Sequence, residues 1–209
     1  MESKEHWNKI YTDKSPTEVS WFQKHADLSL SLIRNTGIPA SASIIDVGGG
    51  ESTLVDDLLA QEYENITVLD LSKVALDAAK SRLGKNASKV QWIESNVLEA
   101  ELPLHAYDIW HDRAVFHFLT IEEDRRAYVQ QVKHAVKPGG FVIVATFAED
   151  GPTECSGLPV MRYSADELHS EFGESFKLIN QEKESHHTPN GADQKFIYCL
   201  CKIVDSKSM

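Results

Sequence analysis

The chain has 209 residues and a formal net charge of −11, with 42% hydrophobic and 25% charged residues. This composition is typical of one globular domain with a substantial core, and it excludes collagen-like, coiled-coil and wholly disordered chains. A protein with this negative net charge lacks the positive field that supplies most of the affinity for phosphate backbones. We therefore expect no nucleic-acid partner.

The sequence shows no membrane segment, signal or zinc motif. Its longest apolar stretch, around residues 141–148, is far shorter than the roughly 20 residues needed to cross a bilayer. Residues 1–7 are charged and lack the apolar core of a secretory signal. The three cysteines, Cys155, Cys199 and Cys201, form no Cys-x-x-Cys pair. We therefore expect a cytoplasmic protein with no membrane partner and no metal.

Strand and helix patterns alternate from residue 43 onwards. In this first half, Thr53-x-x-Asp56 and Ser72 are the expected helix caps, and Gly84 ends the second helix. The predicted elements are strands at 43–47, 65–70, 89–94 and 107–110 and helices at 53–63 and 72–83.

The second half continues the alternation and ends in a hairpin. A helix opens at Thr120-x-x-Glu123 and must stop at Lys137-Pro138-Gly139-Gly140, because proline cannot continue it. Ser164-x-x-Glu167 caps one more helix. The predicted strands lie at 141–147, 176–180 and 195–203. We expect an α/β fold: one Rossmann-like, doubly wound, seven-stranded sheet, mostly parallel, with an antiparallel final hairpin and the ligand at the carboxyl ends of the strands.

A glycine turn and an acid in register with it indicate a nucleotide site. Asp46-Val47-Gly48-Gly49-Gly50 lies where the first strand meets the first helix, and glycines there let the backbone approach a ligand. Asp70 ends the second strand 20 residues after Gly50, where a carboxylate can accept hydrogen bonds from both ribose hydroxyls. The alternative is a tight turn plus an unrelated surface aspartate.

The acids around this turn disfavour a dinucleotide. A dinucleotide fingerprint requires a third glycine where this chain has Thr53, and Glu51, Asp56 and Asp57 would repel a pyrophosphate. These acids suit a cationic ligand, as does Asp46 at the end of a buried strand.

These residues resemble a known family. Asp46-x-Gly48-x-Gly50, Asp70 and Lys137-Pro138-Gly139-Gly140 are similar to the motifs of class I, seven-stranded S-adenosylmethionine-dependent methyltransferases, and the resemblance covers roughly residues 43–147 and extends to the hairpin. Ser52 departs from the third glycine of that pattern, which concerns helix packing more than binding. The resemblance implies S-adenosylmethionine as cofactor, with adenine beside Asn96 and ribose on Asp70. The implied cofactor contacts are Tyr11, Trp21, Asp46, Gly48, Gly50, Asp70, Leu71, Asn96, Val97 and His111.

The amino-terminal segment narrows the resemblance. His6-Trp7-x-x-x-Tyr11 and Ser20-Trp21-Phe22 resemble the opening of the branch containing lysine methyltransferases of elongation factor 1A or citrate synthase and related bacterial enzymes. This implies a helical lid segment, residues 1–40, over a methyltransferase domain, residues 41–205. Aromatic rings attract a sulfonium charge by about 0.5–2 kcal/mol per contact and exclude water. The alternative is that the rings only dock a helix onto the sheet.

The segment after the fourth strand carries the catalytic candidates. In class I enzymes this region, here residues 111–118, lies beside the methionine moiety and the acceptor. Lysine-specific relatives typically have Asp-Lys-Gly-Thr here; this chain keeps an acid and a base at Asp112 and Arg113 but has Ala114-Val115 next. His117 falls where many small-molecule enzymes of the fold carry a histidine, which can take a proton at neutral pH. We expect His117 and Asp112 to be catalytic; the alternative for His117 is a structural histidine.

Two further stretches, residues 155–160 and 184–189, are expected to line the acceptor pocket. The expected substrate contacts are Phe22, Arg113, His186 and His187. Adjacent histidines on a strand face opposite sides, which disfavours a shared metal, and a solvated turn is the alternative.

The sequence therefore predicts a methyltransferase whose acceptor is a protein lysine or a small molecule. Two other classes of protein stay open. One is a nicotinamide-dependent oxidoreductase, which the missing third glycine disfavours. The other is a non-catalytic protein that binds the cofactor.

Overall fold

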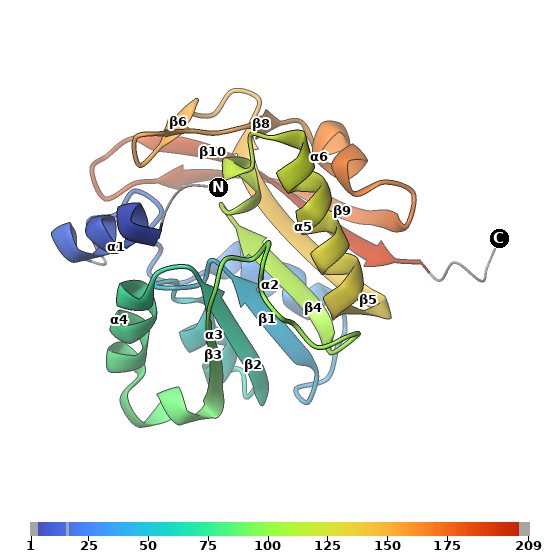
Figure 1. Ribbon diagram of the computed structural model, residues 1–209, viewed down its shortest axis with the longest axis horizontal. Coiled ribbons are helices and arrows are strands. Elements are labelled where there is room, and N and C mark those ends of the chain that lie inside the picture. Colours follow the sequence, from blue (N-terminus) through green and yellow to red (C-terminus); the bar gives the residue numbers. More distant parts are fainter. Residues whose placement is uncertain (1–3, 16, 205–209) are drawn as a thin grey trace.

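The computed structural model describes residues 4–15 and 17–204 (Figure 1). Its main sheet has the order β3-β2-β1-β4-β5-β10-β9, and a further short strand, β8, pairs with β5. Pairing is parallel from β3 to β5 and antiparallel on both sides of β10. The strands are β1 Ser43–Val47, β2 Asn65–Asp70, β3 Val90–Glu94, β4 Tyr107–Arg113, β5 Val136–Ala148, β8 Arg162–Tyr163, β9 Phe176–His187 and β10 Asp193–Ile203, while β6 Glu154–Cys155 and β7 Leu158–Pro159 form a separate pair. The predicted doubly wound sheet with its antiparallel hairpin is confirmed.

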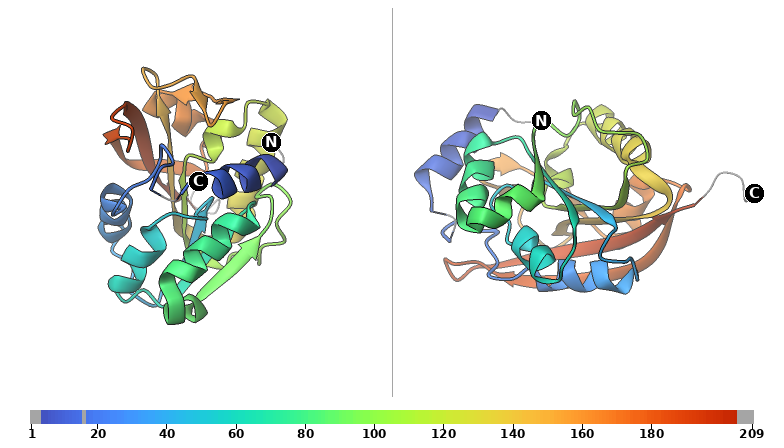
Figure 2. Two further views of the ribbon diagram at one scale, coloured as in Figure 1. Left: turned by 90° about the vertical axis from the view of Figure 1, so that its left-hand side faces the viewer. Right: turned by 90° about the horizontal axis from the view of Figure 1, so that it is seen from below.

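Helices cover both faces of this sheet (Figure 2). One core packs β-strand residues against Leu32, Leu58 and Leu76 of three helices, and the other packs them against Tyr128 and Leu168 of two more. The helices are α1 Lys4–Asp13, α2 Asp27–Asn35, α3 Leu54–Ala60, α4 Lys73–Leu83, α5 Glu122–Ala135 and α6 Ala165–Phe172, with short 3-10 helices at Gly84–Lys89 and Phe116–Phe118. None of the described helices is long and apolar enough to span a bilayer.

Two of the four predicted helix caps form. The Ser72 hydroxyl accepts from the Ala75 N–H at 3.2 Å, and Ser164 makes a reciprocal capping box with Glu167. The Thr53 cap is wrong, because its hydroxyl instead donates to the Gln23 carbonyl at 3.0 Å. The Thr120 cap is wrong as well, since α5 follows Ile121, which makes no side-chain cap.

The Lys137-Pro138-Gly139-Gly140 segment forms a bulge rather than the end of α5. The helix already stops at Ala135. The strand register then jumps from Tyr107–Val136 to Ile109–Phe141, so residues 137–140 have no strand-pairing partner on β4. Gly139 takes φ +78°, which glycine adopts without strain.

The turn after β4 is held by one buried carboxylate. Asp112 accepts hydrogen bonds from the N–H groups of Val115 at 2.8 Å and Phe116 at 3.0 Å, and from the Tyr128 hydroxyl. Trp110 donates to the same hydroxyl at 2.8 Å. Within this turn Ala114 has φ +73°, a left-handed conformation that alanine disfavours.

We expect Ala114→Gly to raise the free energy of unfolding by about 0.5–1 kcal/mol. Relief of about 1–2 kcal/mol of left-handed strain outweighs the greater freedom of glycine in the unfolded chain. Urea unfolding measures the change. Ala60→Gly, at an exposed helical position, is the control and should destabilise the protein by up to about 1 kcal/mol. Equal losses in both variants would show that the turn is unstrained.

Candidate active site

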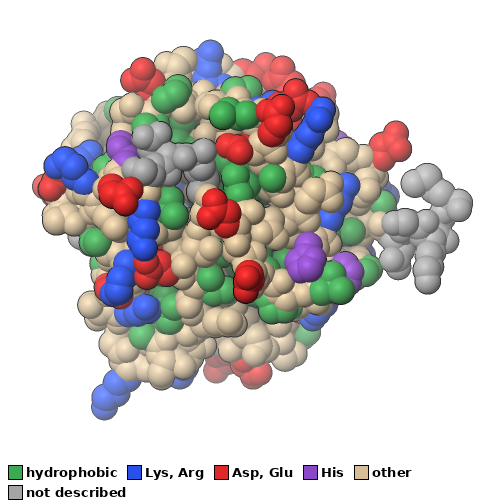
Figure 3. Space-filling view, in the orientation of Figure 1, with side chains coloured by type: hydrophobic (Ala, Val, Ile, Leu, Met, Phe, Trp, Pro, Cys, Tyr) green, Lys and Arg blue, Asp and Glu red, His purple; other side chains and the backbone are tan. Residues whose placement is uncertain are grey.

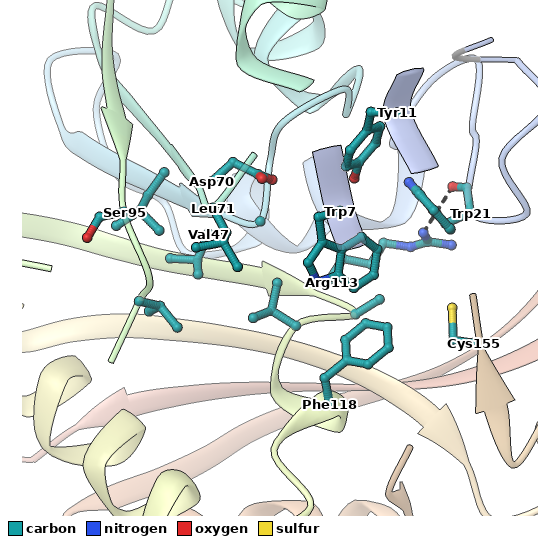
Figure 4. A pocket seen from close by; sticks show the side chains of 15 residues that line it. Trp7, Tyr11, Trp21, Val47, Asp70, Leu71, Ser95, Arg113, Phe118 and Cys155 are labelled. Carbon is teal, nitrogen blue, oxygen red and sulfur yellow. Dashed lines mark hydrogen bonds between the residues drawn. The ribbon is translucent and has the colours of Figure 1, made fainter. Parts of the chain in front are cut away.

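A cavity opens at the carboxyl ends of β1 to β4, where α1 contributes part of its wall (Figure 4). Its described lining combines aromatic rings, the glycine turn and one acid. The lining residues are Trp7, Tyr11, Trp21, Val47, Gly48, Leu69, Asp70, Leu71, Ser95, Val97, Arg113, Ala114, Val115, Phe118 and Cys155.

The glycine turn is packed so closely that no side chain fits. A Cβ on Gly48 would lie 2.1 Å from Val115 Cγ2. On Gly49 it would lie 2.3 Å from Asp46 Oδ2, and on Gly50 2.7 Å from Asp70 Oδ2. The turn therefore passes beneath both carboxylates, an arrangement that only glycine permits.

Asp70 lies at the end of β2 and faces the cavity (Figure 4). Its carboxylate accepts hydrogen bonds from the N–H groups of Gly50 at 3.0 Å and Ser72 at 2.7 Å. Burial nevertheless raises the pKa of Asp70 to about 6, so further donors from a ligand would stabilise its charged form.

The two carboxylate oxygens of Asp46 have different surroundings. Its Oδ1 lies 2.7 Å from His111 Nδ1, and His111 Nε2 lies 2.9 Å from the Ser29 hydroxyl. Asp46 Oδ2 is buried and makes no hydrogen bond to any residue that the structure describes. Asp46 and His111 line a smaller pocket that shares Gly48, Tyr11 and other lining residues with the cavity.

Four aromatic rings from three segments meet over the cavity, and we call them the aromatic cluster: Trp7 and Tyr11 of α1, Trp21 and Phe118. Ring centroids are 5.1 Å apart for Trp7 and Phe118 and 6.0 Å apart for Tyr11 and Trp21. Burial raises the pKa of Tyr11 well above its usual value, so its phenol stays protonated.

Two contacts hold α1 in this position. Ser72, the cap of α4, donates to Asn8 Oδ1 at 2.8 Å, and Lys4 pairs with Glu94 at the end of β3. Helix α1 is thereby tied to the ends of β2 and β3, next to Asp70.

Arg113 joins the amino-terminal segment to the final hairpin. It donates to the Tyr198 hydroxyl at 2.8 Å, to Glu184 Oε2 at 3.2 Å and to the Trp21 carbonyl at 3.3 Å. Its guanidinium also lies 4.2 Å from the centroid of the Phe196 ring. The charge of Arg113 is therefore matched by Glu184 before any ligand binds.

The two predicted catalytic residues lie behind the cavity lining. His117 is fully buried, its ring packs against Phe118 and Phe147, and burial lowers its pKa to about 3. Asp112 is also fully buried and holds the turn described above. A general base must reach the proton that it removes, so this placement supports a structural role for both.

The other sequence-predicted residues divide between the cavity and its surroundings. Leu71 and Val97 line the cavity, whereas the Asn96 side chain accepts the Leu98 N–H at 3.0 Å and lies outside the lining. Phe22 lines the smaller pocket. His186 and His187 line a separate open groove, where His186 Nε2 lies 2.8 Å from the Ser20 carbonyl.

Ser95, Phe118 and Cys155 also line the cavity, although the sequence did not name them as individual contacts. Phe118 and Cys155 fall in the stretches 111–118 and 155–160 that were expected there, and Ser95 directly precedes Asn96. Leu69, inside β2, is a lining residue that the sequence did not single out. Among the described residues there is no group of three or more His, Cys, Asp or Glu that could hold a metal.

The sheet order and the glycine turn between two strand-end carboxylates define a Rossmann-like nucleotide-binding domain. Comparison with known proteins agrees. A family model described as a methyltransferase domain matches residues 45–142. Human EEF1A lysine methyltransferase 2 is 23% identical over 193 residues, covering 86% of this chain and 76% of that protein.

Two solved structures show the same fold. One comes from work on conversion of a disulfide bond into a thioacetal group during echinomycin biosynthesis, with a TM-score of 0.79, 17% identity and coverage of 98% of this chain and 94% of that one. The other is 1,6-didemethyltoxoflavin-N1-methyltransferase of Burkholderia thailandensis with S-adenosylhomocysteine bound, with a TM-score of 0.69, 17% identity and coverage of 97% and 84%. The methyltransferase domain model over residues 45–142 and the methyltransferase relatives support a class I S-adenosylmethionine-dependent methyltransferase.

The burial of His117 predicts a measurable effect of pH on stability. Its pKa falls from 6.5 to about 3 on folding, so the unfolded chain binds the extra proton, and stability is lost as pH falls below about 6.5. Between pH 7 and pH 5 this one group should lower the free energy of unfolding by about 2 kcal/mol.

Urea unfolding of the wild type and of His117→Leu at both pH values isolates this contribution. The variant should lose less stability than the wild type on acidification, whatever its stability at pH 7. The same loss in both proteins would show that the imidazole is not held neutral by the fold.

Proposed function

We propose that the chain binds S-adenosylmethionine in the cavity and transfers its methyl group to an amine nitrogen, with a protein lysine as the first candidate acceptor. The observation that carries this proposal is the charge balance of the lining. Within the described lining the one cation, Arg113, is already matched by Glu184, while Asp70 and the aromatic cluster face the cavity. Such a lining favours a cationic or neutral acceptor over an anionic one.

The residues present fit the cofactor. We infer that Asp70 accepts the ribose hydroxyls and that Leu71, Ser95 and Val97 flank the adenine. The support is their shared place in the lining at the ends of β2 and β3. We place the methionine portion beside the Gly48 turn, where the backbone lines the cavity without a side chain.

The cofactor supplies an electrophilic methyl group on a sulfonium whose departure as a thioether needs no acid. The chain has to hold the acceptor in line and exclude water. The faces of the Tyr11 and Trp21 rings attract the positive charge of the sulfonium. The low polarity of the cavity disfavours the ammonium form of the acceptor amine, so the amine loses its proton to solvent before it is methylated. In this proposal Asp112 and His117 position the turn and exchange no proton with the acceptor.

We propose further that residues 1–40 act as a lid over the domain at 41–205. The contacts of Asn8 with Ser72 and of Lys4 with Glu94 support the closed position of α1. The ends of these segments, residues 1–3 and 205, lie outside the described residues.

A lysine acceptor agrees with the name of the human relative, an EEF1A lysine methyltransferase. A small molecule is the second candidate, favoured by Ala114-Val115 after Asp112 and Arg113 and by the small-molecule acceptor in the name of the Burkholderia enzyme. Figure 3 shows acidic side chains spread across one face among basic ones, which suits a basic protein segment better than nucleic acid. A cytoplasmic location belongs to the same proposal.

Calorimetric titration with S-adenosylmethionine and S-adenosylhomocysteine tests the cofactor. We expect both to bind and a nicotinamide dinucleotide not to bind. Asp70→Asn should weaken both by about 10- to 100-fold, because hydrogen bonds to a charged group contribute about 1.5–3 kcal/mol. Asp77→Asn, an exposed carboxylate on α4, is the matched control. Unchanged affinity in Asp70→Asn would remove Asp70 from the ribose site.

Transfer of a labelled methyl group tests the aromatic cluster and the acceptor together. Trp21→Leu should lower the rate by about 3- to 30-fold, as expected for loss of about 0.5–2 kcal/mol of cation–π attraction, and Trp21→Phe should restore part of it. Trp92→Leu, at a tryptophan outside the cavity on β3, should leave the rate unchanged.

The same assay on a cell lysate separates the two acceptor classes. Label in the protein fraction, in an acid-stable lysine derivative, supports the lysine acceptor. Label in the small-molecule fraction alone would replace it with the second candidate. No transfer despite normal cofactor binding would support a non-catalytic role.

A further inference from the structure

Helix α1 lies along the cavity, and its two ends lie at opposite ends of the lining. Lys4, at its start, pairs with Glu94, which directly precedes the lining residue Ser95. Figure 4 shows Ser95 and Cys155 at opposite ends of the cavity, with Tyr11 of α1 on the side of Cys155. The carboxyl end of α1 is therefore at the Cys155 end of the cavity.

Lys14 directly follows α1 and continues its last turn. Its N–H donates to the Ile10 carbonyl at 3.1 Å. Trp7, Tyr11 and Lys14 follow one another at helical spacing, so they lie on one face of the helix, and the first two line the cavity. Lys14 lies about 4.5 Å beyond Tyr11 along the helix axis. The flexible side chain of Lys14 thus starts on the face of α1 that covers the cavity.

Electrostatics also places the Lys14 amine close to the lining. Burial raises the pKa of the Cys155 thiol to about 11, and the positive charges of Arg113 and Lys14 act in the opposite direction. Arg113 and Cys155 both line the cavity. The charge of Lys14 is therefore felt at the same end of the cavity as that of Arg113.

Lys14 also differs from the two lysines within α1 in having a free amine. Lys4 and Lys9 are held in ion pairs. Lys14 is exposed and makes no ion pair or side-chain hydrogen bond with any residue that the structure describes. Glu18, an acid that feels its charge, accepts hydrogen bonds from Ser15 instead. The Lys14 amine can therefore lose a proton and react without first breaking an ion pair.

We propose that Lys14 is a methyl acceptor of the chain's own active site, so that the enzyme methylates the lysine at the end of its own lid helix. This inference rests on the proposed function, in which the adenine binds beside Ser95 and the amine acceptor reaches the other end of the cavity. The Nζ atom of Lys14 first loses one proton to water. Its lone pair then bonds the methyl carbon, and the electron pair of the broken carbon–sulfur bond stays on sulfur. The methylated amine can take up a proton again, so the charge of Lys14 is kept.

The reaction is intramolecular, because α1 holds Lys14 at the cavity of the same chain. A group held beside its reaction partner reacts as if it were present at a very high concentration, whereas a lysine on another molecule has to diffuse to the cavity. The fraction of chains methylated per unit time should therefore not depend on the protein concentration.

Peptide mapping by mass spectrometry tests the modification site. The full chain is mapped as purified and again after incubation with methyl-labelled S-adenosylmethionine. The peptide with Lys14 should carry about ten times more methyl groups than any other lysine peptide, because only Lys14 is held at the cavity. A dilution series of the protein, with S-adenosylmethionine in excess, should give the same first-order rate constant throughout.

Two arginine variants separate the acceptor role from folding. Lys14→Arg keeps the positive charge but has no lysine amine, so it should lose this methylation and keep the wild-type affinity for S-adenosylhomocysteine in calorimetry. Lys85→Arg, at another exposed lysine that lies outside the cavity lining, is the matched control and should be methylated at Lys14 like the wild type.

A wild type that binds S-adenosylmethionine but carries no methyl group on Lys14 would overturn this inference and leave the proposed function intact. Equal methylation of Lys14 and Lys85 would overturn it as well, because it would show unselective reaction of surface amines. A rate constant that rises in proportion to the protein concentration would overturn the intramolecular step. A wild type that does not bind S-adenosylmethionine would overturn this inference and the proposed function together.

Discussion

The close approach of the glycine turn to two strand-end carboxylates is the constraint on which the site depends. Asp46 is the penultimate residue of β1 and Asp70 is the last residue of the neighbouring parallel strand β2, so both lie at the same edge of the sheet. The backbone of Gly49 and Gly50 passes beneath them with no room for a Cβ. In return the Gly50 N–H binds Asp70. The glycine backbone and the two carboxylates therefore hold each other in place beside the cavity.

Val115, in the turn after β4, connects the opposite wall of the cavity to the glycine turn. Val115 packs directly over Gly48, and its own position is set by the bond from its N–H to Asp112. Asp112 is in turn held by Tyr128 of α5. The network tolerates Ala114 in a left-handed conformation because several hydrogen bonds fix the residues around it. A buried acid behind the cavity lining thus fixes the position of Val115 within that lining.

The sequence predicts those features that local pattern and strand order determine. The strand ends and glycines predicted the order of elements in the sheet and the positions of Asp70 and the glycine turn, because each depends on only a few neighbouring residues. Contacts between segments that are distant in the sequence could not be predicted. Thr53 bonds Gln23, 30 residues earlier, instead of capping its helix, and Arg113 pairs with Glu184, 71 residues later. The burial of His117 could not be predicted either, because it lies in a three-residue helical turn that is too short to show a periodicity.

In the proposed function, the charge of the site also bears on the release of product and the binding of fresh donor. S-adenosylmethionine carries a sulfonium and an ammonium, and methyl transfer leaves a neutral thioether. A cavity that contains Asp70 and adjoins Asp46 and Glu51, with its one described cation already paired, attracts the donor more strongly than the product. The partly buried acids make this difference larger than it would be at an exposed site, since water screens them less. The acids that disfavour a pyrophosphate at this turn are thus the same groups that favour exchange of spent cofactor for fresh donor.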